Sequence, residues 1–121
     1  MSLFSRTPRL ASTARSRKEQ PVAHLAVHPA GEMIIIVTSP DGAQALRTHA
    51  AAGQAITLTH GSTRVHLTPQ KRADIPVHSP TSGWIIALTP AEQRQLATLP
   101  DSGDAQLSSR LAVSVEAPAT N

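Results

Sequence analysis

Short runs of alternating or β-branched residues, separated by turn residues about every ten positions, follow one another along the chain after Pro21. These runs cover residues 22–28, 32–38, 44–49, 54–60 and 63–68. Short strands at even spacing are typical of an all-β sandwich or barrel. Within 63–68, for example, Val65 and Leu67 share one face, and Arg64, His66 and Thr68 share the other. The pattern predicts half-buried hairpin strands.

Two runs, residues 33–37 and 84–88, are apolar on both faces. A strand of this kind is central in a sandwich, is covered by another element, or lies at a contact between subunits. A last strand over residues 107–116 places Leu111, Val113 and Val115 on one buried face by strict alternation.

The clearest local signal for a helix is the stretch Thr89–Pro90–Ala91–Glu92. Thr at the N-cap, Pro at the first helical position and Glu at the third form a capping box. The predicted helix runs over about 90–99, where Pro100 and the turn residues after it end it. No internal repeat is convincing. The expected fold is therefore a small all-β sandwich or barrel of about seven short antiparallel strands, with one short helix before the last strand.

The chain divides into an arm, a body and a short tail. Residues 1–20 are rich in Ser, Thr and Arg without a sustained hydrophobic period, which predicts an extended basic N-terminal arm. Residues 21–117 form a single β domain, with a proline-rich loop over 69–83, and residues 118–121 form a C-terminal tail. The loop is long for a compact domain, and long loops are often functional. It either reaches a neighbour or covers the body with a short edge strand at 75–77.

The composition suggests a thin core. The chain has 121 residues and is 40% apolar, but 19 of the apolar residues are alanine. About 25 larger apolar side chains remain for the body, each contributing about 1.5–3 kcal/mol when buried, against about 1–2 kcal/mol of backbone entropy per residue. A modest core of this kind favours stabilisation by a partner or by another copy of the chain.

The positive charge belongs to the arm. Residues 1–20 carry a net charge of +4 and the other residues a net charge of −1. The sequence pI of about 10.6 therefore describes a basic arm on a nearly neutral body. Five basic residues could neutralise about five phosphates. The body offers only Trp84 for base stacking, inside an apolar run where we expect it to be buried.

Known catalytic and metal-binding arrangements are not evident. The chain has no cysteine, which excludes disulfide scaffolds, thiolate metal sites and cysteine nucleophiles. Its six histidines lack ligand spacing: His24 and His28 would lie about 13 Å apart on a strand, too far for one zinc ion. Nucleophile elbows and phosphate-binding glycine motifs are missing. We therefore predict no enzyme, no catalytic or metal residues, no cofactor and no small-molecule substrate.

These features favour a structural or assembly protein that oligomerises, or docks on a larger assembly, through its arm, as capsid-stabilising proteins of bacteriophages do. The residues predicted to bind the partner are Leu3, Phe4, Arg6, Arg9, Arg15, Arg17, Lys18, Lys71 and Arg72. A nucleic-acid-binding or regulatory module using the same arm is the alternative. A third possibility is an organelle transit arm, cleaved near Gln20. We expect a cytoplasmic or virion location, and no membrane partner, because no apolar run has spanning length.

Overall fold

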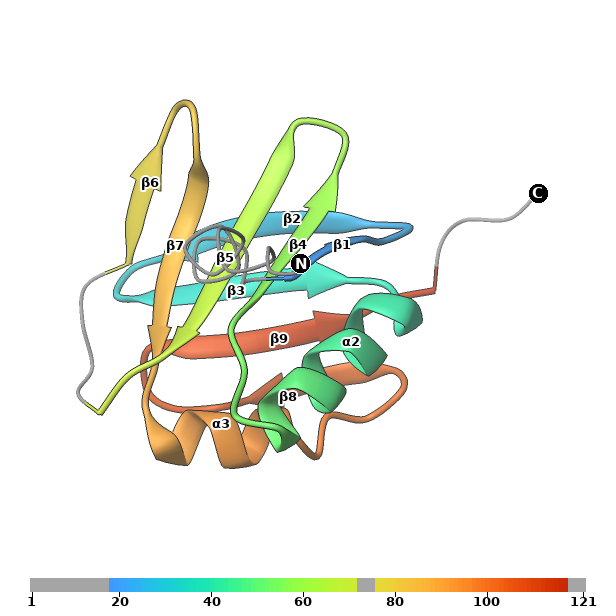
Figure 1. Ribbon diagram of the computed structural model, residues 1–121, viewed down its shortest axis with the longest axis vertical. Coiled ribbons are helices and arrows are strands. Elements are labelled where there is room, and N and C mark those ends of the chain that lie inside the picture. The colour runs from blue at the N-terminus through green and yellow to red at the C-terminus, as the bar shows by residue number, and fades with distance from the viewer. Residues whose placement is uncertain (1–17, 72–75, 118–121) are drawn as a thin grey trace, which may run out of the picture.

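The computed structural model describes residues 18–71 and 76–117. Its strands form two mixed sheets (Figure 1). The first has the order β1 (Lys18–Pro21), β4 (Ile56–His60), β5 (Thr63–Pro69), β7 (Gly83–Leu88) and β6 (Val77–Ser79). The second has the order β2 (Leu25–Ala30), β3 (Met33–Thr38), β9 (Leu111–Val115) and β8 (Gly103–Gln106). The helices are α2 (Pro40–Ala51) and α3 (Pro90–Leu96), which contact each other.

The β-rich character predicted from the sequence is confirmed, but the antiparallel arrangement is not. Three strand pairs are parallel: β1 with β4, β3 with β9, and β5 with β7. The described residues contain nine strands and two helices, and the sheets do not close into a barrel. Each helix carries the chain from one sheet to the other. In each sheet, a hairpin from the N-terminal part of the chain therefore lies beside a hairpin from the C-terminal part, and the two adjoining strands run parallel: β3 with β9, and β5 with β7. The spacing of turns along the sequence carries no signal for such a crossing.

The topology consists of two equivalent halves, although no internal repeat is convincing in the sequence. The first half is β2–β3–α2–β4–β5 and the second is β6–β7–α3–β8–β9. In this correspondence β2 matches β6, β3 matches β7, β4 matches β8 and β5 matches β9. Replacing each strand of the second sheet, β2–β3–β9–β8, by its match gives β6–β7–β5–β4, which is the first sheet without β1. Residues fifty positions apart match along the central strand and the helix: Ile36 with Ile86, Pro40 with Pro90, and Leu46 with Leu96.

Helix α2 replaces the strand predicted over 44–49, and that prediction is wrong. The stretch from Ser39 to Gly42 has the composition of a turn, but Ser39 is the N-cap and Pro40 lies in the first helical turn. Leu46 and the small residues Ala43 and Ala50 are buried against the rest of the core. The alanine-rich sequence is compatible with a helix because alanine has the highest helix propensity.

Gly42 packs directly beneath Thr38, at the end of β3. A Cβ atom at position 42 would lie 2.0 Å from the Thr38 hydroxyl oxygen, which donates a hydrogen bond to the His24 carbonyl. We expect Gly42→Ala to destabilise the protein by about 1–3 kcal/mol through overpacking, whereas the same change in an open helix stabilises by about 1 kcal/mol. Urea unfolding measures the difference. In a Thr38→Ala background the loss should shrink or reverse, and an equal loss in both backgrounds would contradict this account.

Helix α3 begins as predicted and its capping box is present. The helix ends at Leu96, and two strands, β8 and β9, follow it. The sequence predicted a single strand over 107–116, and this prediction is wrong at its start because β9 begins only at Leu111. Residues 107–110 form the turn before β9, where Leu111, Val113 and Val115 are buried as the alternation predicted.

The side chain of Glu92 lies in the interior and joins α3 to this turn. Its Oε1 accepts hydrogen bonds from the Thr89 amide (2.9 Å) and Arg110 Nη2 (2.8 Å). Its Oε2 accepts from Arg110 Nε (2.9 Å) and from the Ser108 hydroxyl (2.6 Å). Arg110 also donates to the Ala87 carbonyl. The carboxylate thus links the capping box to residues sixteen and eighteen positions away.

The core contains residues of both sheets and both helices. Its buried apolar residues run from Val22 to Val115 in one continuous cluster, with no member in β1. The two runs apolar on both faces become β3 and β7, and each is an interior strand of its sheet. Among the described residues, the apolar core therefore contains none that precede Val22.

Candidate interaction site

Strand β1 is where the N-terminal segment enters the fold. It runs parallel to β4, with Lys18 opposite Ile56 and Pro21 opposite Thr59. The Val22 amide extends this pairing by donating to the Thr59 carbonyl at 2.9 Å. The last residues of the predicted arm are thus an added edge strand of the first sheet.

An ion pair links β1 to the middle of the sheet. The carboxylate of Glu19 accepts a hydrogen bond from the guanidinium of Arg64 on β5. Both side chains are substantially exposed, at 57% for Glu19 and 39% for Arg64. An exposed pair of this kind contributes at most about 1 kcal/mol, so main-chain pairing with β4 is the larger determinant of where β1 lies.

The residues after β1 are held by the N-terminal end of α2. The Ala23 amide donates to Asp41 Oδ2 (3.1 Å), and the His24 amide donates to the Ser39 hydroxyl (3.2 Å). Burial raises the pKa of Asp41, but hydrogen bonds from Ser39 and from the Ala23 and Gly42 amides outweigh it and lower the pKa below its ordinary value. These contacts fix where the chain leaves β1.

Of the residues predicted to bind a partner, the structure describes Lys18 and Lys71. Lys18 is the first residue of β1, and Lys71 follows β5, with β4 lying between the two strands. The other predicted residues lie outside the described residues: Leu3, Phe4, Arg6, Arg9, Arg15, Arg17 and Arg72.

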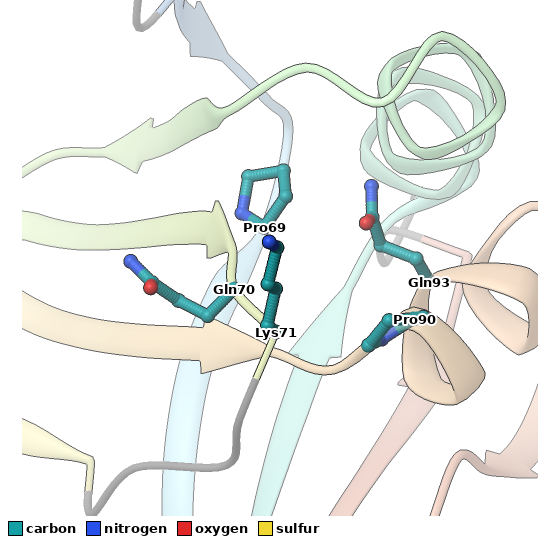
Figure 2. Close-up of a pocket in the computed structure, with 5 residues that line it drawn as sticks. All are labelled: Pro69, Gln70, Lys71, Pro90 and Gln93. Carbon is teal, nitrogen blue, oxygen red and sulfur yellow. The ribbon is translucent and has the colours of Figure 1, made fainter.

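Lys71 lines a cavity of about 620 Å³ between the end of β5 and α3. Figure 2 shows its side chain on one side of this cavity and Gln93 of α3 on the other. The remaining lining residues are Pro69, Gln70 and Pro90. Among the described residues, this lining offers one cation and two amides and no carboxylate.

Two large apolar side chains are exposed on the hairpin β6–β7. Val77 is 53% exposed and Ile85, directly opposite it on β7, is 39% exposed. Ile85 is a member of the run 84–88 that the sequence showed as apolar on both faces. Val77 was placed on a short edge strand over 75–77, and the strand observed is Val77–Ser79.

Trp84 is half-buried and packs against the core, with its ring 5.0 Å from that of His78. It lines a second cavity, of about 410 Å³, together with residues of β2 and of the turns 61–63 and 79–83. Trp84 is therefore only partly buried, whereas its apolar run predicted burial.

Three histidine side chains make hydrogen bonds within the fold: His49, His60 and His66. His66, in the middle of β5, is buried between the Thr57 hydroxyl (2.7 Å) and the Ser82 carbonyl (2.6 Å). His24 and His60 contact each other, with ring centroids 6.1 Å apart. Among residues 18–71 and 76–117 there is no group of three or more His, Asp or Glu side chains that could hold a metal ion.

No helix within the described parts of the chain has the length and apolar character needed to span a membrane. No protein-family model matches the chain, and no curated protein sequence is significantly similar to it.

Proposed function

We propose that this chain is a non-enzymatic structural protein that oligomerises, or docks on a larger assembly, through its N-terminal arm. The observation that carries the proposal is the geometry of β1. The last residues of the arm pair along the edge of β4, and the following residues are anchored to α2. An arm attached to a rigid body at a sheet edge is well placed to reach a neighbouring molecule.

Two further features support an assembly role. The apolar composition of the chain is rich in alanine, which leaves few large apolar side chains for a body of this size, and a small domain of this kind gains stability from association. Val77 and Ile85 also present adjoining apolar surface on the outside of the first sheet. A decorating or stabilising protein of a bacteriophage capsid is the type of molecule we have in mind.

Deletion of residues 2–17 tests the proposal, because it removes the arm and leaves β1 in place. The buried apolar residues that the structure describes all lie at or after Val22, so we expect an unchanged far-ultraviolet circular dichroism spectrum and a cooperative unfolding transition. Light scattering should give the mass of an oligomer for the full chain and that of a single chain for the deletion variant. A folded deletion variant that keeps the full mass would remove the arm from the mechanism.

Nucleic-acid binding by the same arm is the second candidate, and the concentration of charge in residues 1–20 favours it. Five neutralised phosphates predict that the logarithm of the association constant falls against the logarithm of salt concentration with a slope of about −4 to −5. Fluorescence anisotropy with a labelled DNA duplex measures this slope. Binding that ignores salt, or that is absent at about 50 mM salt, would exclude this candidate.

A further inference from the structure

The two equivalent halves of the fold allow the edge occupied by β1 to be compared with its counterpart. Leu58 of β4 pairs with Val65, which pairs with Trp84 of β7. In the other half, the Leu107 amide donates to the carbonyl of Leu111, which pairs with Ile34 of β3. Leu107 is thus the counterpart of Leu58, and the residue before each corresponds in the same way: Gln106 to Thr57.

The outer edge of β4 is occupied and that of β8 is open. The Thr59 carbonyl accepts a hydrogen bond from the Val22 amide, so the main-chain groups of Thr59 point to the β1 side of β4. In an antiparallel pair, the main-chain groups of every second residue point to the same side, so those of Thr57 also point toward β1. The Leu107 amide points toward β9, because it donates to the Leu111 carbonyl. Neighbouring residues of a strand point their main-chain groups to opposite sides, so the N–H and C=O of Gln106 point away from β9. No strand among residues 18–71 and 76–117 pairs on that side of β8.

The open edge is accessible. Asp104 and Gln106 are both exposed, and the Gln106 side chain donates to the carbonyl of Ser108 at 3.0 Å. A strand pairing along 105–108 would displace this amide, which is held by a single exposed hydrogen bond. An exposed sheet edge with unpaired main-chain groups is a template for an added strand.

Charge and length indicate which segment fits this edge. Residues 1–17 contain four arginines and no acidic residue. Two exposed carboxylates lie beside the start of β8: that of Asp104, which accepts from the Ser114 hydroxyl, and that of Asp101, which pairs with Arg47 at 3.0 Å. A second β8 pairing there would bring like charges together. Seventeen extended residues reach about 56 Å, whereas a body of this size has a radius of gyration of about 13 Å. The arm is long enough to cross to a neighbouring molecule.

We propose that the outer edge of β8 and of the two residues after it, over 105–108, receives residues 1–17 of a second copy of this chain as an added strand, in the way that β4 receives β1. Because the Ser108 amide donates to the Leu111 carbonyl, the main-chain groups offered to this strand are the N–H and C=O of Gln106 and the C=O of Ser108. This inference rests on the proposed function and names its docking surface. The contact is head-to-tail, because the arm of one molecule meets a different surface of the next. Such contacts build rings or open chains of molecules.

The full-length variants Gln106→Pro and Gln106→Ala form a matched test. Both variants remove the Gln106 side chain, but only proline also removes the main-chain N–H that points away from β9. Because this N–H makes no hydrogen bond to β9, the proline leaves the β8–β9 hydrogen bonds intact. Light scattering should give the mass of a single chain for Gln106→Pro and the wild-type mass for Gln106→Ala. An arm-dependent oligomer that persists in a folded Gln106→Pro would overturn docking at β8 and leave the proposed function standing. Full mass after deletion of residues 2–17 would instead refute the proposed function.

Disulfide cross-linking provides a second test that does not depend on the proline variant folding. The chain has no cysteine, so Ser12→Cys chains can be mixed with Ser109→Cys chains, which carry an exposed thiol beside the proposed edge. The control partner is Ala30→Cys, which is exposed on β2. Cross-linked dimers should form at least tenfold faster with Ser109→Cys. Equal rates for the two partners would overturn the proposal. So would a double variant, Ser12→Cys with Ser109→Cys, that forms its disulfide within one chain at high dilution, because the arm would then reach the edge of its own molecule.

Discussion

Glu92→Ala is expected to destabilise the protein by about 3–5 kcal/mol, the usual cost of removing one partner from a buried ion pair. The side chain of Glu92 is 2% exposed and accepts hydrogen bonds from Thr89, Ser108 and Arg110. The substitution removes both the capping box of α3 and the charge that offsets the desolvation of the Arg110 guanidinium. The connection between α3 and the turn before β9 is lost with it.

Urea unfolding of the two variants Glu92→Ala and Glu19→Ala measures this effect against a matched control. Glu19 also pairs with an arginine, but on the surface, so its removal should cost at most about 1 kcal/mol. Similar losses for the two variants would contradict the structural role given to the buried pair.

The same carboxylate makes stability depend on pH. Burial raises the pKa of Glu92, but hydrogen bonds from Arg110, Ser108 and the Thr89 amide, with the charge of Arg110, outweigh it and lower the pKa below its ordinary value of 4.5. A lowered pKa in the folded state means that the carboxylate stabilises the fold above about pH 4.5 and that this contribution is lost as the pH falls through the folded value. Between pH 7 and pH 3, Glu92→Gln should lose less stability than the wild type, and parallel profiles would contradict this.

The second large effect is expected for Gly83→Ala, at about 2–5 kcal/mol. Gly83 has φ of +86° at the start of β7, a conformation that costs an L side chain about 1–2 kcal/mol. Its added Cβ would also lie 2.3 Å from the main-chain oxygen of Arg64, on the neighbouring strand β5. Main chain cannot yield as a flexible side chain does, so the parallel β5–β7 pair would have to separate locally.

Gly61→Ala separates the two contributions. Gly61 has φ of +59°, and a Cβ there would meet no atom within 4 Å, so this variant carries the conformational cost alone. We expect its free energy of unfolding to fall by about 1–2 kcal/mol, clearly less than for Gly83→Ala. Equal losses in urea unfolding would show that the close approach at Arg64 is not significant.

Local signals in the sequence predicted the elements whose causes are local. The capping box from Thr89 to Glu92 and the alternation of Leu111, Val113 and Val115 both correspond to observed structure. Helix α2 was missed because the turn-forming residues from Ser39 to Gly42 conceal an N-cap. Gly42 is present because of its contact with Thr38 in the folded structure, which no local pattern indicates.

The remaining features depend on contacts between residues distant in sequence. The pairing of Glu92 with Arg110 and the parallel pairing of β3 with β9 both arise only once the two halves cross between the sheets. The predicted arm ends in a strand because β4 presents an edge to it, which its polar sequence did not indicate. The open edge of β8 was not predictable either, because it is recognised only by its equivalence to the edge of β4.

The most direct test of the central claim is the solution mass of the full chain and of the variant lacking residues 2–17, by light scattering at about 50 mM and 500 mM salt. An arm that adds as a strand predicts an oligomer at both salt concentrations, weakened at the higher one as its arginines are screened, and a single chain for the variant throughout. A full chain with the mass of one molecule at every concentration and salt would contradict it.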